Sequence, residues 1–248
     1  MKNSFLTAFL LFLVRYRRTF LGPFWLLIGP SMFIACLGLL YAQIGALQPE
    51  VFIPHLAIGL VIWTLINGFI VGSAKIFQRN RSQILNGSQS LEDIVAVDVI
   101  SILLSFTHQL PIILIVFLIY GIGLSWYALE SFIGLCFLIV NGVWVSYVFG
   151  ILGARFRDLV EIINAAMRII FLATPIIWMP GGGAHGSVKV AFLSFNPFYH
   201  FVEIFRMPLL GQSPTLLSWG VVFGFTISGF LAALIMKKCY ARFVPFWA

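Results

Sequence analysis

The chain has 248 residues, of which 61% are hydrophobic and only 9% are charged, and its mean hydropathy is +1.04. Soluble domains carry about a quarter charged residues, so this composition excludes a soluble protein and predicts an integral membrane protein. The net charge of +7 does not indicate nucleic-acid binding, because the basic residues lie at the ends of apolar runs, where they contact anionic lipid and fix topology. Cys36, Cys136 and Cys239 lack the spacing of a metal or redox site, so we expect neither metal nor nucleic acid as a partner.

The N-terminal arm, residues 1–18, is predicted to be an interfacial helix. Its apolar run from Phe5 to Val14 is too short to cross about 30 Å of hydrocarbon. The run ends in Arg15, Arg17 and Arg18 rather than in small residues suited to signal-peptide cleavage. We therefore expect the arm to lie in the cytoplasmic membrane surface, with its apolar side in lipid and its arginines among the headgroups.

Six apolar runs follow the arm, and each predicts a transmembrane helix. About 20 residues cross the hydrocarbon core of a membrane, a length that these runs reach or approach. The predicted spans cover approximately residues 23–46, 54–74, 98–120, 132–153, 162–178 and 216–236. Pro30, Pro111 and Pro175 are expected to kink or interrupt the first, third and fifth of them.

The basic residues predict the orientation of this all-α fold. Most of the fifteen Lys and Arg residues lie in the arm, in the 75–97 loop, beside the end of the fourth span, and in the C-terminal tail. The opposite side has only Lys189 and Arg206. The positive-inside rule therefore places both termini in the cytoplasm. Arg168, about two turns into the fifth span, is long enough to reach the cytoplasmic surface, and a functional contact is the alternative.

Two connections are expected to form structure outside the spans. The loop at residues 75–97 is too polar for lipid, and its Asn86-Gly87 pair predicts a turn between two short helices. Ser90, followed by two acidic residues, predicts the N-terminal cap of the second of these helices.

The other structured connection, residues 179–214, is predicted to lie on the outer side. It contains two amphipathic pieces, at about Val188–Phe195 and Phe198–Leu210, and each is too short to cross the membrane. We interpret both pieces as re-entrant or interfacial helices, which are tolerated at depth only against protein or a water-filled path.

The third span carries a polar seam. Asp98, Ser101, Ser105 and His108 are spaced by three or four residues, so they lie on one face of a helix. Hydrogen bonding to neighbouring helices and lining of a transport path are both open interpretations. An intramembrane enzyme is a remote alternative, because the sequence has no G-x-S-x-G motif to accompany these side chains.

A nucleotide-binding loop is not expected in this chain. The glycine-rich stretch at residues 181–187 lacks the lysine that a phosphate-binding loop requires. We therefore predict no catalytic residue and no cofactor in this chain.

Aromatic side chains on the first span are candidates for a substrate path. They are Trp25, Phe33 and Tyr41, and the apolar faces of sugar rings pack well on such rings. Packing against lipid or protein is the alternative for each of them.

At this point the sequence resembles a known family, the membrane subunits of bacterial ABC-2-type exporters of cell-envelope polysaccharides such as O-antigen, capsule and teichoic acid. The resemblance covers nearly the whole chain. It depends on the order and spacing of Arg15, Tyr16, Arg17, Arg18, Thr19, Leu21, Gly22, Trp25 and Pro30, of Arg157, Asp158 and Leu159, of Thr174, Pro175 and Ile176, and of Asn196, Pro197, Phe198, His200, Glu203 and Arg206.

The resemblance implies one permease domain, residues 1–248, that forms a homodimer with a path between the two copies. It also implies two copies of a separate ATPase subunit, which would bind ATP and Mg²⁺. The 75–97 loop would supply the coupling helix, and the helices within 179–214 would cover the outer mouth. The candidate contacts to the ATPase are Arg79, Arg81, Glu92, Asp93, Arg157 and Asp158.

The expected function is ATP-driven export of lipid-linked polysaccharide, O-antigen first among the options, from the cytoplasm across a bacterial inner membrane. Arg15, Arg17 and Arg18 would then lie near the diphosphate of the lipid carrier, although topology alone also requires such a cluster. Export of a drug or of another small lipid-like molecule is the alternative within transporters.

Overall fold

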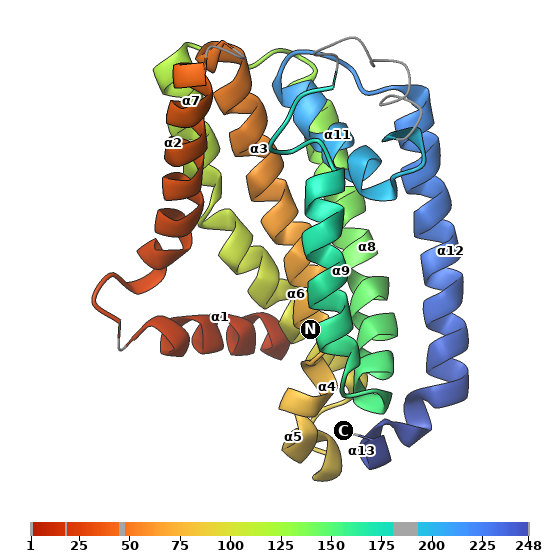
Figure 1. Cartoon of the computed structure of the whole chain (residues 1–248). Coiled ribbons are helices and arrows are strands. Elements are labelled where there is room, and N and C mark those ends of the chain that lie inside the picture. The colour runs from red at the N-terminus through yellow and green to blue at the C-terminus, as the bar shows by residue number, and fades with distance from the viewer. Residues whose placement is uncertain (1, 18, 45–47, 181–192, 248) are drawn as a thin grey trace.

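A bundle of upright helices makes up the computed structural model, and one helix, α1, lies across the bundle (Figure 1). The structure describes residues 2–17, 19–44, 48–180 and 193–247, and these contain helices and no strand. We call the end that carries α4, α5 and α13 the lower end and the opposite end the upper end, as drawn in Figure 1. In chain order the elements are α1 (Lys2–Tyr16), η1 (Gly22–Phe24), α2 (Trp25–Ile44), α3 (Pro49–Asn67), η2 (Gly68–Gly72), α4 (Ile76–Arg79), α5 (Arg81–Leu85), α6 (Leu91–Thr107), α7 (Leu110–Tyr120), α8 (Ala128–Arg155), α9 (Leu159–Ala173), α11 (Pro197–Leu209), α12 (Leu216–Tyr240), η3 (Ala241–Phe243) and α13 (Val244–Trp247).

Five helical stretches of the described residues are long and apolar enough to cross a membrane. They are Gly22–Tyr41, Pro49–Gly72, Leu91–Tyr120, Ala128–Arg155 and Leu216–Trp247. This finding confirms an all-helical protein that crosses the membrane several times, with five full-length spans where we predicted six.

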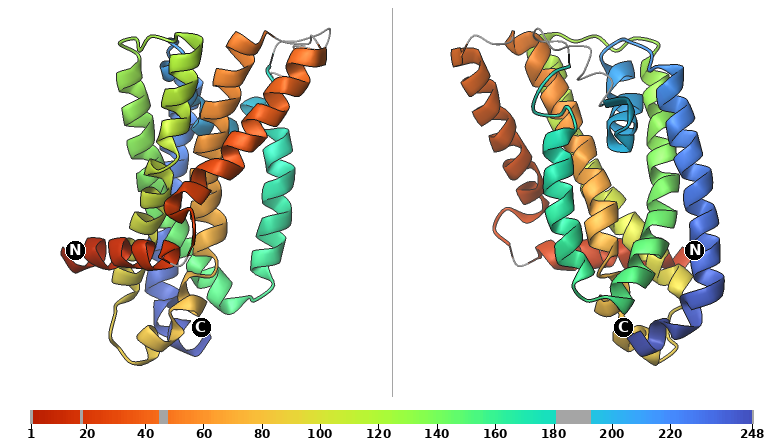
Figure 2. Two further views of the ribbon diagram at one scale, coloured as in Figure 1. Left: turned by 90° about the vertical axis from the view of Figure 1, so that its left-hand side faces the viewer. Right: turned by 45° about the vertical axis from the view of Figure 1, so that its right-hand side comes forward.

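The remaining predicted span is α9, which is shorter than expected. It has 15 residues and ends at Ala173, whereas the prediction continued to Trp178. Thr174 already has an extended backbone, with ψ of 133°, because the proline that follows disfavours a helical conformation in the residue before it. Figures 1 and 2 show α9 running upward beside the other upright helices.

The third predicted span begins earlier than expected and consists of two helices. The Ser90 hydroxyl accepts a hydrogen bond from the Asp93 backbone N–H at 3.1 Å, so the predicted cap is confirmed. The predicted turn is confirmed by Gly87, whose φ is +62°. Helix α6 stops at Thr107, and α7 starts at Leu110 with Pro111 in its first turn, where a missing N–H costs nothing.

Helix α3 lies at the centre of the core. It packs against α2, α7, α11 and α6, and most of its side chains are buried. Helices α2 and α12 flank the bundle and expose apolar side chains, as expected for helices that face lipid or another subunit. Helix α8 packs closely on its neighbours through glycines: a Cβ atom added at Gly134 would lie 2.6 Å from the Ile204 carbonyl oxygen of α11.

Helix α1 confirms that the N-terminal arm is helical. It lies nearly at right angles to the bundle at the level of α6 (Figures 1 and 2), and it packs against that helix. Ala8 and Phe12 are buried, and the Phe12 and His108 ring centroids are 4.7 Å apart. The opposite side exposes apolar side chains, in keeping with the predicted position in a membrane surface. These are Phe5, Leu6, Phe9, Leu10, Leu11, Leu13 and Val14.

Helix α11 confirms the second of the two short helices predicted between the last two spans. It lies at the upper end, packed against α8, α12 and α3. The first predicted piece, at about Val188–Phe195, falls largely outside the described residues.

Candidate functional site

A groove of about 580 Å³ between α2, α3 and α9 is the first candidate site. It combines aromatic, amide and cationic side chains at the depth of the spans. Its lining residues are Gly29, Pro30, Phe33, Leu60, Trp63, Thr64, Asn67, Asn164, Met167, Arg168, Phe171 and Leu172.

The aromatic part of this groove contains one of the three predicted path residues. Phe33 of α2 and Trp63 of α3 both lie near Phe171 of α9, with ring centroids 6.5 Å and 5.5 Å away. Such rings offer flat apolar surfaces in a groove that also has polar walls.

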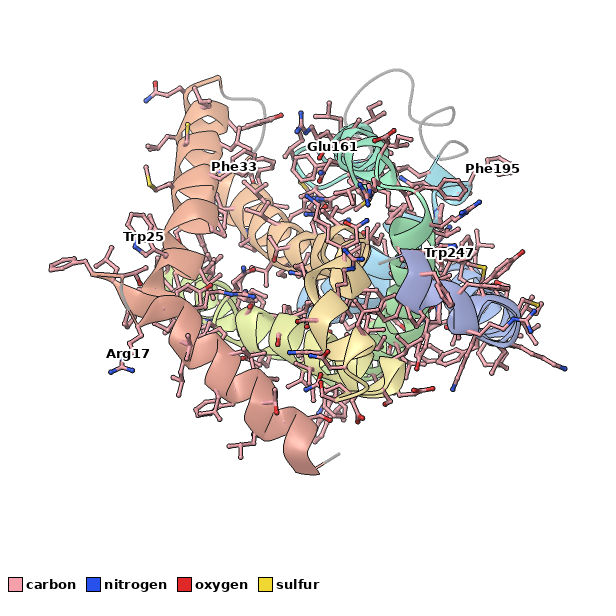
Figure 3. The ribbon with its side chains drawn as sticks, turned by 90° about the horizontal axis from the view of Figure 1, so that it is seen from below. Arg17, Trp25, Phe33, Glu161, Phe195 and Trp247 are labelled. Carbon is pink, nitrogen blue, oxygen red and sulfur yellow. The ribbon has the colours of Figure 1, made fainter. Side chains whose placement is uncertain are left out.

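The other two predicted aromatic residues lie elsewhere. Trp25 is exposed at the outer side of α2, whereas Phe33 lies on the side that faces the rest of the bundle (Figure 3). Tyr41 packs in the core near the upper end: its ring stacks on Phe52 at a centroid distance of 4.3 Å, and its hydroxyl donates to the Ile177 carbonyl oxygen at 3.1 Å. Of the three, Phe33 alone lines the groove.

The polar seam of the third span borders a second, smaller cavity of about 210 Å³ between α1, α3 and α6. Ser101 and Ser105 line it together with Arg15, Arg79 and Asp98. Both hydroxyls donate to backbone carbonyl oxygens of their own helix, Ser101 to Val97 at 2.7 Å and Ser105 to Ser101 at 3.0 Å.

His108, at the upper end of the same seam, is also bonded to its own helix. Its Nδ1 donates to the Leu104 carbonyl oxygen at 2.7 Å, and its ring packs on Phe12. Among the described contacts no serine hydroxyl bonds to this imidazole, so the seam lacks the pair of nucleophile and base that a hydrolase needs.

Asp98 connects the seam to the lower loop. Its carboxylate pairs with Arg79 of α4 at 3.2 Å and accepts a hydrogen bond from Ser73 at 3.2 Å. Ser73 is also 2.8 Å from the hydroxyl of Ser146 on α8, and both serines are fully buried. Arg79 donates in addition to the carbonyl oxygen of Gly72 at 2.9 Å, at the end of the π-helical segment η2. The lower loop, the end of η2, α6 and α8 are therefore joined by one polar network.

The arginines predicted to form one cluster in the arm lie in different surroundings. Arg15 lines the second cavity, and Arg17 is exposed and points away from the bundle (Figure 3). Arg18 lies outside the described residues.

With this geometry established, comparison with known proteins identifies the family. The model of the ABC-2 type transporter membrane family matches residues 9–210, which include the groove, the seam and α11. The chain belongs to the ABC-2 type transporter family. It is also 22% identical, over 192 residues, to the O-antigen export system permease protein RfbA of Myxococcus xanthus, and the match covers 77% of this chain and 74% of that protein.

Membership of the ABC-2 family makes this chain a transport subunit rather than an enzyme, and it implies an ABC transporter with an ATPase partner. The hydrolase alternative for the polar seam is therefore set aside.

The lower end of the ABC-2 permease carries the six side chains predicted to contact the ATPase, and all six are exposed. Two of the six already have intramolecular ion-pair partners: Arg79 pairs with Asp98, and Glu92 pairs with Lys237 of α12 at 2.6 Å. Asp93 accepts a hydrogen bond from the Ser90 hydroxyl at 2.8 Å.

For Arg81, Arg157 and Asp158 the described residues show no side-chain hydrogen bond or ion pair. These three are therefore the freest of the predicted contacts. The C-terminal tail folds back under α8, where the Arg155 guanidinium lies 5.1 Å from the ring of Trp247.

At the upper end of the permease, Arg206 of α11 forms a buried polar cluster. It pairs with Glu203 of the same helix and donates to the Pro175 carbonyl oxygen at 2.6 Å. Its Nη1 also lies 2.9 Å from Nε2 of His55 on α3. Because a guanidinium only donates, this nitrogen of His55 is the acceptor. His55 was not predicted from the sequence as a site residue. The feature that could have indicated it is that His55 is the only ionisable side chain in the apolar run 51–74.

Proposed function

We propose that this permease exports lipid-linked polysaccharide, O-antigen in particular, across a bacterial inner membrane. The observation that carries the proposal is the groove between α2, α3 and α9, because it combines aromatic rings with amide and cationic side chains at the depth of the spans. A sugar polymer on a lipid anchor needs both kinds of surface: apolar faces for pyranose rings and polar groups for hydroxyls and phosphate. The similarity to a permease for O-antigen export supports the same cargo.

In the proposed assembly, two copies of the chain face each other across this groove, and each supplies one wall of the path. One feature supports this arrangement: α2 and α9 border the groove with exposed apolar side chains such as Met32, Ile169 and Leu172. Closing the groove with a second copy would bury these side chains and enclose the polar ones.

We take α9 as the fifth of six spans, completed by the residues that follow it up to Trp178, with both termini in the cytoplasm. The concentration of basic residues at the lower end supports this orientation. Two ATPase subunits, which would hold ATP and Mg²⁺, then bind below α4, α5 and the exposed Arg157 and Asp158. Helix α11 would cover the outer mouth.

Deletion of the gene in its source bacterium tests the cargo. The proposal predicts that the surface polysaccharide is lost, that its lipid-linked form accumulates in the cytoplasmic leaflet, and that the wild-type gene restores export. Unchanged surface polysaccharide combined with new sensitivity to small apolar drugs would instead support the alternative, an exporter of small molecules.

A further inference from the structure

Helix α9 carries a polar stripe that faces the groove. Asn164 and Arg168 line the groove, and Glu161 lies one turn below Asn164 on the same face, because the spacings of three and four residues match the helical repeat. The side of α9 that carries Val160, Ile163 and Met167 is buried. A membrane-depth helix with such a stripe turns it toward an aqueous path rather than toward lipid.

Arg168 lies well inside the membrane-depth part of the bundle. It is nine residues beyond the first residue of α9, which at about 1.5 Å per residue places its Cα roughly 13 Å above the lower start of that helix. Charged side chains at such depth normally pair with an opposite charge. Among the described residues, however, Arg168 has no ion pair or hydrogen bond, in contrast to the other deep arginine, Arg206, which pairs with Glu203.

Two amides accompany this guanidinium. Asn164 lies on the same helix face, and Asn67 contributes from α3 on the opposite wall of the groove. Neither amide has a side-chain hydrogen bond among the described contacts. One cation and two amide groups without described partners therefore face one groove, and a guanidinium fork beside amide N–H groups matches the oxygens of a phosphate ester.

We propose that Arg168, Asn164 and Asn67 bind the phosphate-ester headgroup of the lipid-linked cargo when it enters the groove. This inference rests on the proposed function and adds the residues that recognise the headgroup. The rings of Phe33, Trp63 and Phe171 line the same groove, beside the place where the first sugars would follow the phosphate.

Binding of a radiolabelled polyprenyl diphosphate to the permease in phosphatidylcholine nanodiscs tests the inference. We expect Arg168→Ala to weaken binding about tenfold or more, and Asn67→Leu several-fold, because each removes a hydrogen bond to a charged group. Arg168→Lys keeps the charge without the fork and is expected to lie between Arg168→Ala and wild type. The matched control is Arg242→Ala, which removes an exposed arginine of the lower tail, and it should bind within about twofold of wild type.

Competing lipids distinguish the source of the phosphate. Polyprenol, which lacks phosphate, should not displace the probe, and phosphatidate should displace it only in large excess. Equal displacement by phosphatidate would overturn the assignment to cargo, since the site would then bind any lipid phosphate.

The outcomes also separate this inference from the proposed function. If wild type binds the probe and a monodisperse Arg168→Ala protein binds it equally well, the assignment of the headgroup site is wrong, while the proposed cargo is unaffected. If wild type does not bind the probe, although it assembles with an active ATPase, the proposed cargo fails and this inference fails with it.

Discussion

Arg206 donates a hydrogen bond to the backbone carbonyl oxygen of Pro175 at 2.6 Å, and this contact joins α11 to the break that ends α9. The same guanidinium pairs with Glu203, and it is almost completely buried. The upper ends of α3, α9 and α11 are thus held by one side chain.

Arg206→Met is therefore expected to destabilise the protein by about 3–5 kcal/mol, because it leaves the Glu203 carboxylate buried without a cation. The measurement is the denaturation midpoint in mild detergent. The double variant Arg206→Met, Glu203→Met should recover much of the loss, since it leaves no uncompensated charge. An unchanged midpoint in the single variant would show that the cluster does not hold these helices together.

Gly134→Ala is expected to cost about 1–3 kcal/mol, because the new methyl group would meet the Ile204 backbone carbonyl, which cannot rotate away as a side chain can. Gly224→Ala on α12 is the matched control: its Cβ has open space, and alanine favours a helix by about 1 kcal/mol. Equal thermal stability of the two variants would contradict the close packing of α8 on α11.

Arg15 and Arg17 are expected to differ in their effect on export. Neutralising the whole cluster, including Arg18, should sharply reduce export even in variants that insert correctly. Arg15→Gln should account for more of this loss than Arg17→Gln, because Arg15 lines the cavity beside Asp98 and Arg17 points away from the bundle. The readout is surface polysaccharide, normalised to inserted protein. Unchanged export in the correctly inserted triple variant would leave topology as the only role of the cluster.

Disulfide crosslinking tests the proposed homodimer. In a variant that lacks the native cysteines, Leu172→Cys at the groove and Leu231→Cys on α12 each introduce one thiol. The two leucines are similarly exposed, at 61% and 56% of their surface. Oxidation in membranes is expected to give a crosslinked dimer with Leu172→Cys and not with Leu231→Cys. A dimer formed only through Leu231→Cys would place the interface on the wrong side of the molecule.

The features that could be predicted from sequence are those fixed by neighbours along the chain. The apolar runs predicted the helices, the Asn86-Gly87 pair predicted the turn, and Ser90 predicted the helix cap. Each of these features depends on a few adjacent residues. The end of α9 was predicted five residues too late. Pro175 was expected only to kink the helix, whereas Thr174 before it already leaves the helical conformation.

The contacts that build the site could not be predicted in the same way, because they join residues far apart in the sequence. The pairing of Arg206 with His55 and that of Ser73 with Ser146 both depend on how α3 is packed in the bundle. In the sequence, Trp25 and Phe33 were equivalent candidates for a substrate path. Only the packing of α2 against α3 and α9 shows that Phe33 lines the groove.

The most direct test of the account is photocrosslinking of cargo during export. A photoreactive phenylalanine analogue at Phe33 or Phe171 is expected to form adducts with polysaccharide, in an ATP-dependent manner, in cells that express the permease with its ATPase. The same analogue at Leu231, on the exposed face of α12, should form none. Polysaccharide adducts at Leu231, or none at the two groove positions while export proceeds, would contradict the claim that this groove is the path.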